Sequence, residues 1–75
     1  MRSTHSQEYR DFSGRLRQAR KEARLKQVEV AKILGRPQSY VSKCESGERR
    51  VDVTELAKFA EVYSKQLDFF VKPNN

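Results

Sequence analysis

Apolar side chains recur every three or four residues along the first third of the chain, which is the spacing of one helix face. The pattern predicts a helix that opens at Ser6 or Gln7 and continues to about Ala23. The residues before it are polar and have no periodicity, so residues 1–7 are interpreted as a flexible arm. The predicted stripe comprises Tyr9, Phe12, Leu16, Ala19 and Ala23.

The next segment, "KQVEVAKILG", carries Val30, Ala31 and Leu34 at helical spacing and ends on a glycine. Gly35 is a suitable helix stop because glycine tolerates the left-handed conformation. Pro37 disfavours helix in the residue before it and suits a helix start. A third short helix is therefore predicted from Gln38 to about residue 45, ending near the next glycine.

Asp52, followed three residues later by Glu55, has the pattern of a capping box and predicts a fourth helix. A last short helix is predicted over about residues 65–71, with Leu67 and Phe70 as its apolar positions. No segment alternates with period two, so no strand is expected. The prediction is an all-α, compact bundle of about five short helices, with one domain over residues 8–72 and a tail over 73–75. The expected apolar face of the fourth helix comprises Val53, Leu56, Phe59, Ala60 and Tyr63.

A length of 75 residues allows one domain with a small core, for which oligomerisation is a natural source of further stability.

The basic residues are concentrated in one part of the chain. The net charge is +6, but residues 1–50 carry 13 basic and 6 acidic side chains, whereas residues 51–75 carry 3 and 4. A one-sided basic surface attracts polyanions, nucleic acid first and anionic membrane second.

Several kinds of chemistry find no support in the sequence. One cysteine excludes an intramolecular disulfide, and one cysteine with one histidine excludes an ordinary zinc cluster. No nucleophile–base pair, paired carboxylates or phosphate-binding glycine loop is present, so no enzyme activity, cofactor, metal or small-molecule ligand is predicted. Cys44 is interpreted as a small buried hydrophobe, and His5 has no visible set of partner ligands. The absence of a long apolar run or a secretory signal leaves the cytoplasm as the expected location.

From about Leu16 to Phe70 the chain resembles the helix-turn-helix domains of lambda-type repressors and Cro proteins, the XRE family. The resemblance rests on "Q..VAKILG", on "QSYVSK.E.G.R", and on the spacing of Leu56 and Phe59. It implies a helix-turn-helix at about residues 27–45, double-stranded DNA as the partner, and a homodimer that regulates transcription from a palindromic operator. In such domains the third helix lies in the major groove.

The resemblance also implies roles for individual residues. A glutamine can pair with adenine through two hydrogen bonds, lysine can bind guanine acceptors, and serine can do either. The expected base contacts are Gln38, Ser39, Ser42 and Lys43. The expected contacts to the DNA backbone are Lys26, Gln27, Arg36, Tyr40, Arg49 and Arg50. Tyr40 is also a candidate for contact with a thymine methyl group.

Arg20 and Glu45 match a pair that forms an interior salt bridge in some relatives. The alternative is an exposed pair, which contributes little to stability.

The chain departs from common family members at three sites, with Arg24 in place of glycine, Lys26 in place of serine or threonine, and Pro37 in place of a capping serine. One interpretation is that Lys26 exchanges the stability of a good N-cap for a cation that attracts phosphate. Neutral sequence drift explains the change equally well.

Phe69 and Phe70 are adjacent, so one helix face does not bury both. Phe70 aligns with a core position, and Phe69 and Val71 are then predicted to point outward and form a two-fold dimer contact. The alternative is that Phe69 packs against the N-terminal arm or Tyr9.

For the protein as a whole, the competing hypothesis is a protein-interaction or antitoxin-type module with the same fold. The basic charge argues against that hypothesis, and the aromatic residues near the C-terminus favour it.

Overall fold

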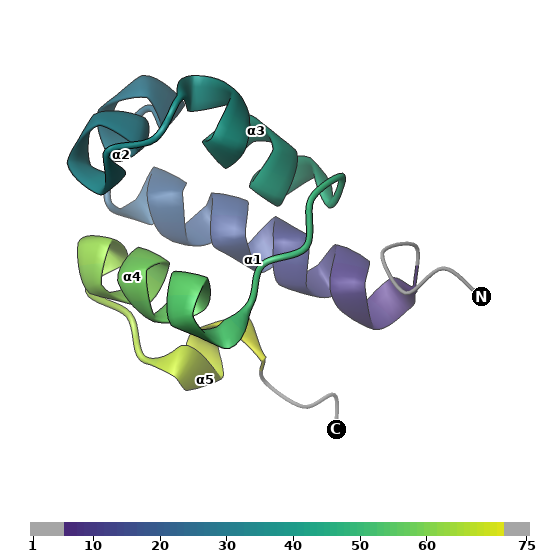
Figure 1. Ribbon diagram of the computed structural model, residues 1–75. Helices are drawn as coiled ribbons and strands as arrows, with labels where there is room; N and C mark the ends of the chain where they lie inside the picture. Colours follow the sequence, from purple (N-terminus) through teal and green to yellow (C-terminus); the bar gives the residue numbers. More distant parts are fainter. Residues whose placement is uncertain (1–5, 72–75) are drawn as a thin grey trace.

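The computed structural model describes residues 6–71, which fold into five α-helices and contain no strand (Figure 1). The all-α prediction is confirmed. The helices are α1 (Gln7–Glu22), α2 (Gln27–Leu34), α3 (Gln38–Ser46), α4 (Val53–Tyr63) and α5 (Leu67–Phe70). The predicted arm lies outside the described residues except for Ser6, the N-cap of α1, and Gln7, its first residue. The predicted tail at 73–75 lies wholly outside them.

Helix α1 lies along the middle of the molecule in Figure 1, beside two pairs of helices that also contact each other through α2 and α4. Helices α2 and α3 pack against each other on one side, and α4 and α5 lie on the other. Helix α1 contacts α3, α4 and α5, so the longest helix organises the small core. The α2–α3 pair is thereby held against α1 through α3.

Local signals in the sequence set the helix ends. Gly35 ends α2 with a φ of 68°, and the N–H of Arg36 returns to the carbonyl of Ala31 at 2.9 Å. This is the hydrogen-bond pattern of a glycine-terminated helix. At the start of α4, Asp52 Oδ1 accepts from the N–H of Glu55 at 2.8 Å, and Glu55 Oε1 accepts from the N–H of Asp52 at 3.0 Å. The capping box is therefore present.

The core is built from aromatic and aliphatic side chains of all five helices. Tyr40 and Phe59 stack with their ring centroids 6.1 Å apart, and Phe59 also stacks on Tyr63. Cys44 is fully buried, and burial raises the pKa of its thiol, which reduces the thiolate available for reaction. The side chains with essentially no exposure are Leu16, Val30, Val41, Cys44, Phe59 and Phe70.

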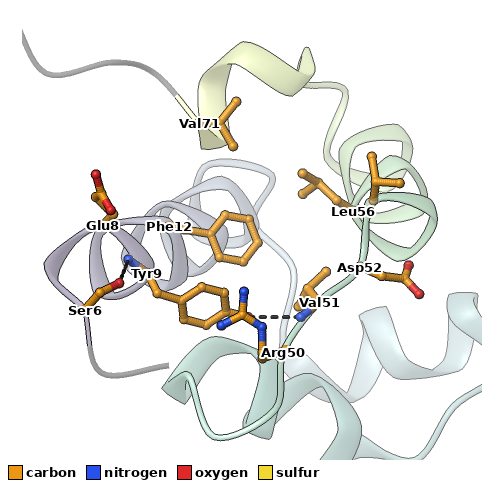
Figure 2. Close-up of a pocket in the computed structure, with 10 residues that line it drawn as sticks. Ser6, Glu8, Tyr9, Phe12, Arg50, Val51, Asp52, Leu56 and Val71 are labelled. Atoms are coloured by element: carbon orange, nitrogen blue, oxygen red, sulfur yellow. Dashed lines mark hydrogen bonds between the residues drawn. The ribbon is translucent and has the colours of Figure 1, made fainter. Parts of the chain in front are cut away.

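Two predicted core positions are wrong. Val53 is 70% exposed although it was placed on the apolar face of the fourth helix, and Leu67 is 42% exposed. Val53 is the first residue of α4 and borders an open hollow of about 510 Å³. Figure 2 shows this hollow, with Phe12 on the α1 side, Leu56 on the α4 side and Val71 at the end of α5. The last helix is also shorter than predicted: α5 covers Leu67–Phe70, whereas about residues 65–71 were expected.

Candidate nucleic-acid interface

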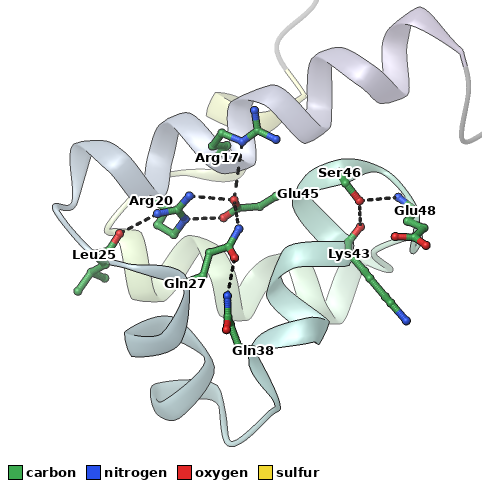
Figure 3. Close-up of polar contacts among 9 residues, drawn as sticks. All are labelled: Arg17, Arg20, Leu25, Gln27, Gln38, Lys43, Glu45, Ser46 and Glu48. Atoms are coloured by element: carbon green, nitrogen blue, oxygen red, sulfur yellow. Dashed lines mark hydrogen bonds and ion pairs between the residues drawn. The ribbon is translucent and has the colours of Figure 1, made fainter.

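Helix α3 divides into a buried face and an exposed face. Tyr40, Val41, Cys44 and Glu45 are buried. The four predicted base contacts are all exposed, and their spacing of one, four and five residues places them on the opposite side of the helix. Figure 3 shows the Lys43 side chain extending away from the rest of the protein. The structure thus brings Gln38, Ser39, Ser42 and Lys43 together on one solvent-facing surface.

A chain of polar contacts links this surface to the interior (Figure 3). Arg20 on α1 donates to both carboxylate oxygens of Glu45, from Nε at 2.7 Å and from Nη2 at 3.0 Å. Gln27 Nε2 donates to Glu45 Oε1 at 3.0 Å, and Gln38 Nε2 donates to Gln27 Oε1 at 3.0 Å. The side chain of the first residue of α3 is therefore connected through α2 to an ion pair between α1 and α3.

The Arg20–Glu45 pair lies inside the protein. The Glu45 side chain is 1% exposed and that of Arg20 is 13% exposed, which excludes the alternative of a solvated surface pair. The hydrogen bonds that Arg20 donates to Glu45 raise the pKa of Arg20, and Arg20 Nη1 also donates to the carbonyl of Leu25 at 3.0 Å. Arg17, which the sequence did not single out, approaches Glu45 at 3.8 Å from the exposed side of α1.

Tyr40, which was expected to contact the DNA backbone, is largely buried. Its side chain packs into the core, 8% of the residue is exposed, and burial raises the pKa of its hydroxyl to about 12. Arg36 and Arg49 both lie over its ring, with their guanidinium carbons 4.3 Å and 4.8 Å from the centroid. Tyr40 is thus a support for two arginines rather than an open surface for DNA.

Glu55 is the residue at this site that sequence reasoning missed. Arg49 Nη1 lies 3.1 Å from its carboxylate and Arg36 Nη2 lies 3.8 Å from it. The capping-box pattern identifies Glu55 as a residue that starts α4, but no local signal connects it to arginines in two other segments. Arg50 lies over the Tyr9 ring at 4.8 Å instead.

Lys26 is the residue before α2, and its side chain makes no capping hydrogen bond. The Glu29 carboxylate accepts from the Lys26 N–H at 2.7 Å, which satisfies one donor at the start of this helix. Pro37 occupies the same position before α3, again with no side-chain cap, and α3 begins at Gln38 as expected. Both departures from the family pattern therefore leave a helix without an N-cap side chain.

The two predicted dimer residues differ in exposure. Val71 is 60% exposed and borders the hollow of Figure 2, together with Tyr9, Phe12 and Leu56. Phe69 is partly buried: its ring contacts Phe70 edge-on, and Lys65 Nζ lies 4.5 Å from its centroid. Phe69 thus packs partly against the core rather than pointing freely outward.

A comparison against family models agrees with the geometry of this site. The features in question are the α2–α3 pair, the left-handed glycine between these helices and the exposed polar face of α3. The model described as "Helix-turn-helix domain" matches residues 11–65, which is most of the chain. The protein belongs to this helix-turn-helix family. The resemblance to lambda repressor and Cro-type domains is confirmed at this level. Neither the search of curated proteins nor the search of solved structures found a match.

Within residues 6–71, no three or more His, Cys, Asp or Glu side chains group closely enough to hold a metal ion. None of the helices in that range combines the length and the apolar character that crossing a membrane requires.

Proposed function

We propose that this protein is a sequence-specific transcriptional regulator that binds a palindromic DNA operator as a homodimer. The observation that carries the proposal is the exposed face of α3, where Gln38, Ser39, Ser42 and Lys43 lie together within the basic part of the chain. Helix-turn-helix proteins insert this helix into the major groove. The family match supports DNA binding by this chain.

The side chains on this face suit base recognition. Gln38 uses one N–H to bind Gln27, which leaves its side-chain oxygen and its second N–H for the complementary groups of adenine. Lys43 carries donors suited to the O6 and N7 acceptors of guanine. Each good two-pronged pair contributes about 1–3 kcal/mol of discrimination against a wrong base.

Contacts to phosphate come from the residues around α3. Arg36 precedes the helix and Arg49 follows it, and their side chains remain 45% and 40% exposed. Lys26 and Gln27 lie at the N-terminus of α2, where the helix dipole favours an anion. Such contacts fix the position of a protein on DNA and give affinity that falls as salt increases.

For the dimer, the proposed contact includes Val71 and the hollow beside it, with Phe69 at its edge. Val71→Glu should convert a dimer to a monomer in sedimentation equilibrium, because a buried carboxylate without a partner is strongly unfavourable. Ile33→Glu is the matched control, since Ile33 is also 60% exposed but lies on α2. A Val71→Glu protein that remains dimeric would remove this surface from the proposal.

The function itself is tested by selecting binders from a random duplex pool at near-physiological salt and sequencing the enriched DNA. The expected result is a palindrome whose half-sites lie about one helical turn apart. With Gln38→Ala, preference should relax at one base position in each half-site, whereas an equal loss on operator and random DNA would contradict its role. No enrichment by the wild-type protein would reject the regulator and favour a protein-interaction module, for which exposed Val53 and Val71 provide an apolar surface.

A further inference from the structure

The Glu55 carboxylate connects three segments around α3. Arg36 comes from the turn before α3, Arg49 from the loop after it, and Glu55 from the first turn of α4. Glu55 lies 3.1 Å from Arg49 Nη1 and 3.8 Å from Arg36 Nη2, and its side chain is only 13% exposed. The same two guanidinium groups lie over the ring of Tyr40.

The Glu55 carboxylate offsets the repulsion between the guanidinium groups of Arg36 and Arg49. Two guanidinium cations that share one aromatic ring repel each other, and a carboxylate that contacts both offsets that repulsion. The hydrogen bond from Arg49 lowers the pKa of Glu55, so this side chain is ionised at neutral pH. Arg49 Nη1 is further fixed by the carbonyl of Arg50 at 3.0 Å. Both arginines nevertheless keep nearly half of their side-chain surface open to an approaching phosphate.

We propose that Glu55 is a positioning residue that holds Arg36 and Arg49 in place and limits their binding to phosphates at random positions. The inference rests on the proposed DNA-binding function. A free arginine neutralises any nearby phosphate and so contributes to binding of every sequence. An arginine held by Glu55 binds well only where a phosphate meets its fixed position. Glu55 therefore raises the ratio of operator affinity to random-DNA affinity.

The test is the salt dependence of binding to a fluorescent duplex of random sequence. Glu55→Gln removes the negative charge but keeps the side-chain oxygen that accepts from the Asp52 N–H, so the start of α4 is retained. The slope of log affinity against log salt should become steeper by about 1 to 2, one for each released arginine. Affinity for random DNA at low salt should rise about threefold or more.

Two variants separate positioning from charge. Glu61→Gln makes the same charge change on α4, and Glu61 is exposed and pairs with no cation among residues 6–71. Its salt slope should match the wild type. Glu55→Asp keeps the charge on a shorter side chain and should behave like Glu55→Gln. Equal effects of Glu55→Gln and Glu61→Gln, or wild-type behaviour of Glu55→Asp, would overturn the positioning role.

A measurement without DNA keeps the proposal independent of the proposed function. In the free protein, ¹⁵N relaxation of the arginine Nε groups should show Arg36 and Arg49 to be ordered in the wild type and mobile in both Glu55 variants. Thermal unfolding of each variant confirms that it is folded. Ordered arginines in folded Glu55→Gln would overturn the inference. A wild-type protein that selects no DNA motif would instead reject the regulator, and the relaxation data would still decide whether Glu55 holds the arginines.

Discussion

The side-chain amide of Gln38, the first residue of α3, donates to the side-chain oxygen of Gln27, the first residue of α2, at 3.0 Å. Gln27 in turn donates to the buried carboxylate of Glu45. The Glu45 carboxylate only accepts hydrogen bonds, so the NH₂ group of the Gln27 amide must face it. The Gln27 oxygen then faces Gln38 and fixes the orientation of the Gln38 amide. The hydrogen-bonding groups that Gln38 presents to solvent are thus determined by an ion pair in the interior.

A double-mutant cycle should detect this coupling. Gln27→Ala frees the Gln38 amide to rotate, so part of the discrimination that Gln38 provides should be lost even though Gln38 is unchanged. We expect Gln27→Ala and Gln38→Ala to be non-additive on the selected operator by about 0.5–1.5 kcal/mol, the net value of one hydrogen bond. On a random duplex the two changes should add. Additive losses on the operator, measured by fluorescence anisotropy at one salt concentration, would show that Gln27 does not orient Gln38.

The buried ion pair also makes a prediction about stability. Glu45→Gln leaves the Arg20 guanidinium in the interior without its counter-ion, and should lower the free energy of unfolding by about 3–5 kcal/mol. Arg20→Met combined with Glu45→Leu should recover much of that loss, because neither charge is then buried alone. Urea denaturation of the three proteins measures both effects. Glu22→Gln is the control, since Glu22 pairs with Lys65 on the surface and should change stability little. A small loss for Glu45→Gln would mean that water reaches Arg20.

The parts of this fold that the sequence predicted are those set by local interactions. Gly35 and the Asp52–Glu55 pair determine helix ends within a few residues of themselves, so their consequences are visible in the sequence. The packing of Tyr40 is not visible in the sequence because its partners, Phe59 and the two arginines, lie in other segments. The ion pair of Arg20 and Glu45 was expected through the family resemblance alone. The contacts of Glu55 with arginines depend on how three segments meet, which no spacing in the sequence encodes.

The end of α1 carries a conformational cost that a substitution should remove. Arg24 has a φ of 61°, in the left-handed region that glycine adopts without steric cost. A side chain in that region costs about 1–2 kcal/mol, and the larger freedom of glycine in the unfolded chain offsets part of the gain. Arg24→Gly should therefore raise the free energy of unfolding by about 0.5–1 kcal/mol in urea denaturation. Gly35→Ala, at a φ of 68°, is the opposite change and should lower it. Stabilities that move in the same direction for both variants would contradict this explanation.

The stability of the protein should fall in acid partly through Glu55. The hydrogen bond from Arg49 lowers the pKa of Glu55 in the folded protein, so protonation of this group favours the unfolded chain. Its contribution is present above the ordinary glutamate pKa of about 4.3 and is lost as the pH falls through the lower folded value. Thermal unfolding from about pH 7 to about pH 3 should therefore show a shallower loss of stability for Glu55→Gln than for the wild type. Glu61→Gln, whose carboxylate has no arginine partner among the described residues, should follow the wild-type curve. Parallel curves for wild type and Glu55→Gln would show that the contacts with Arg49 and Arg36 do not stabilise the fold.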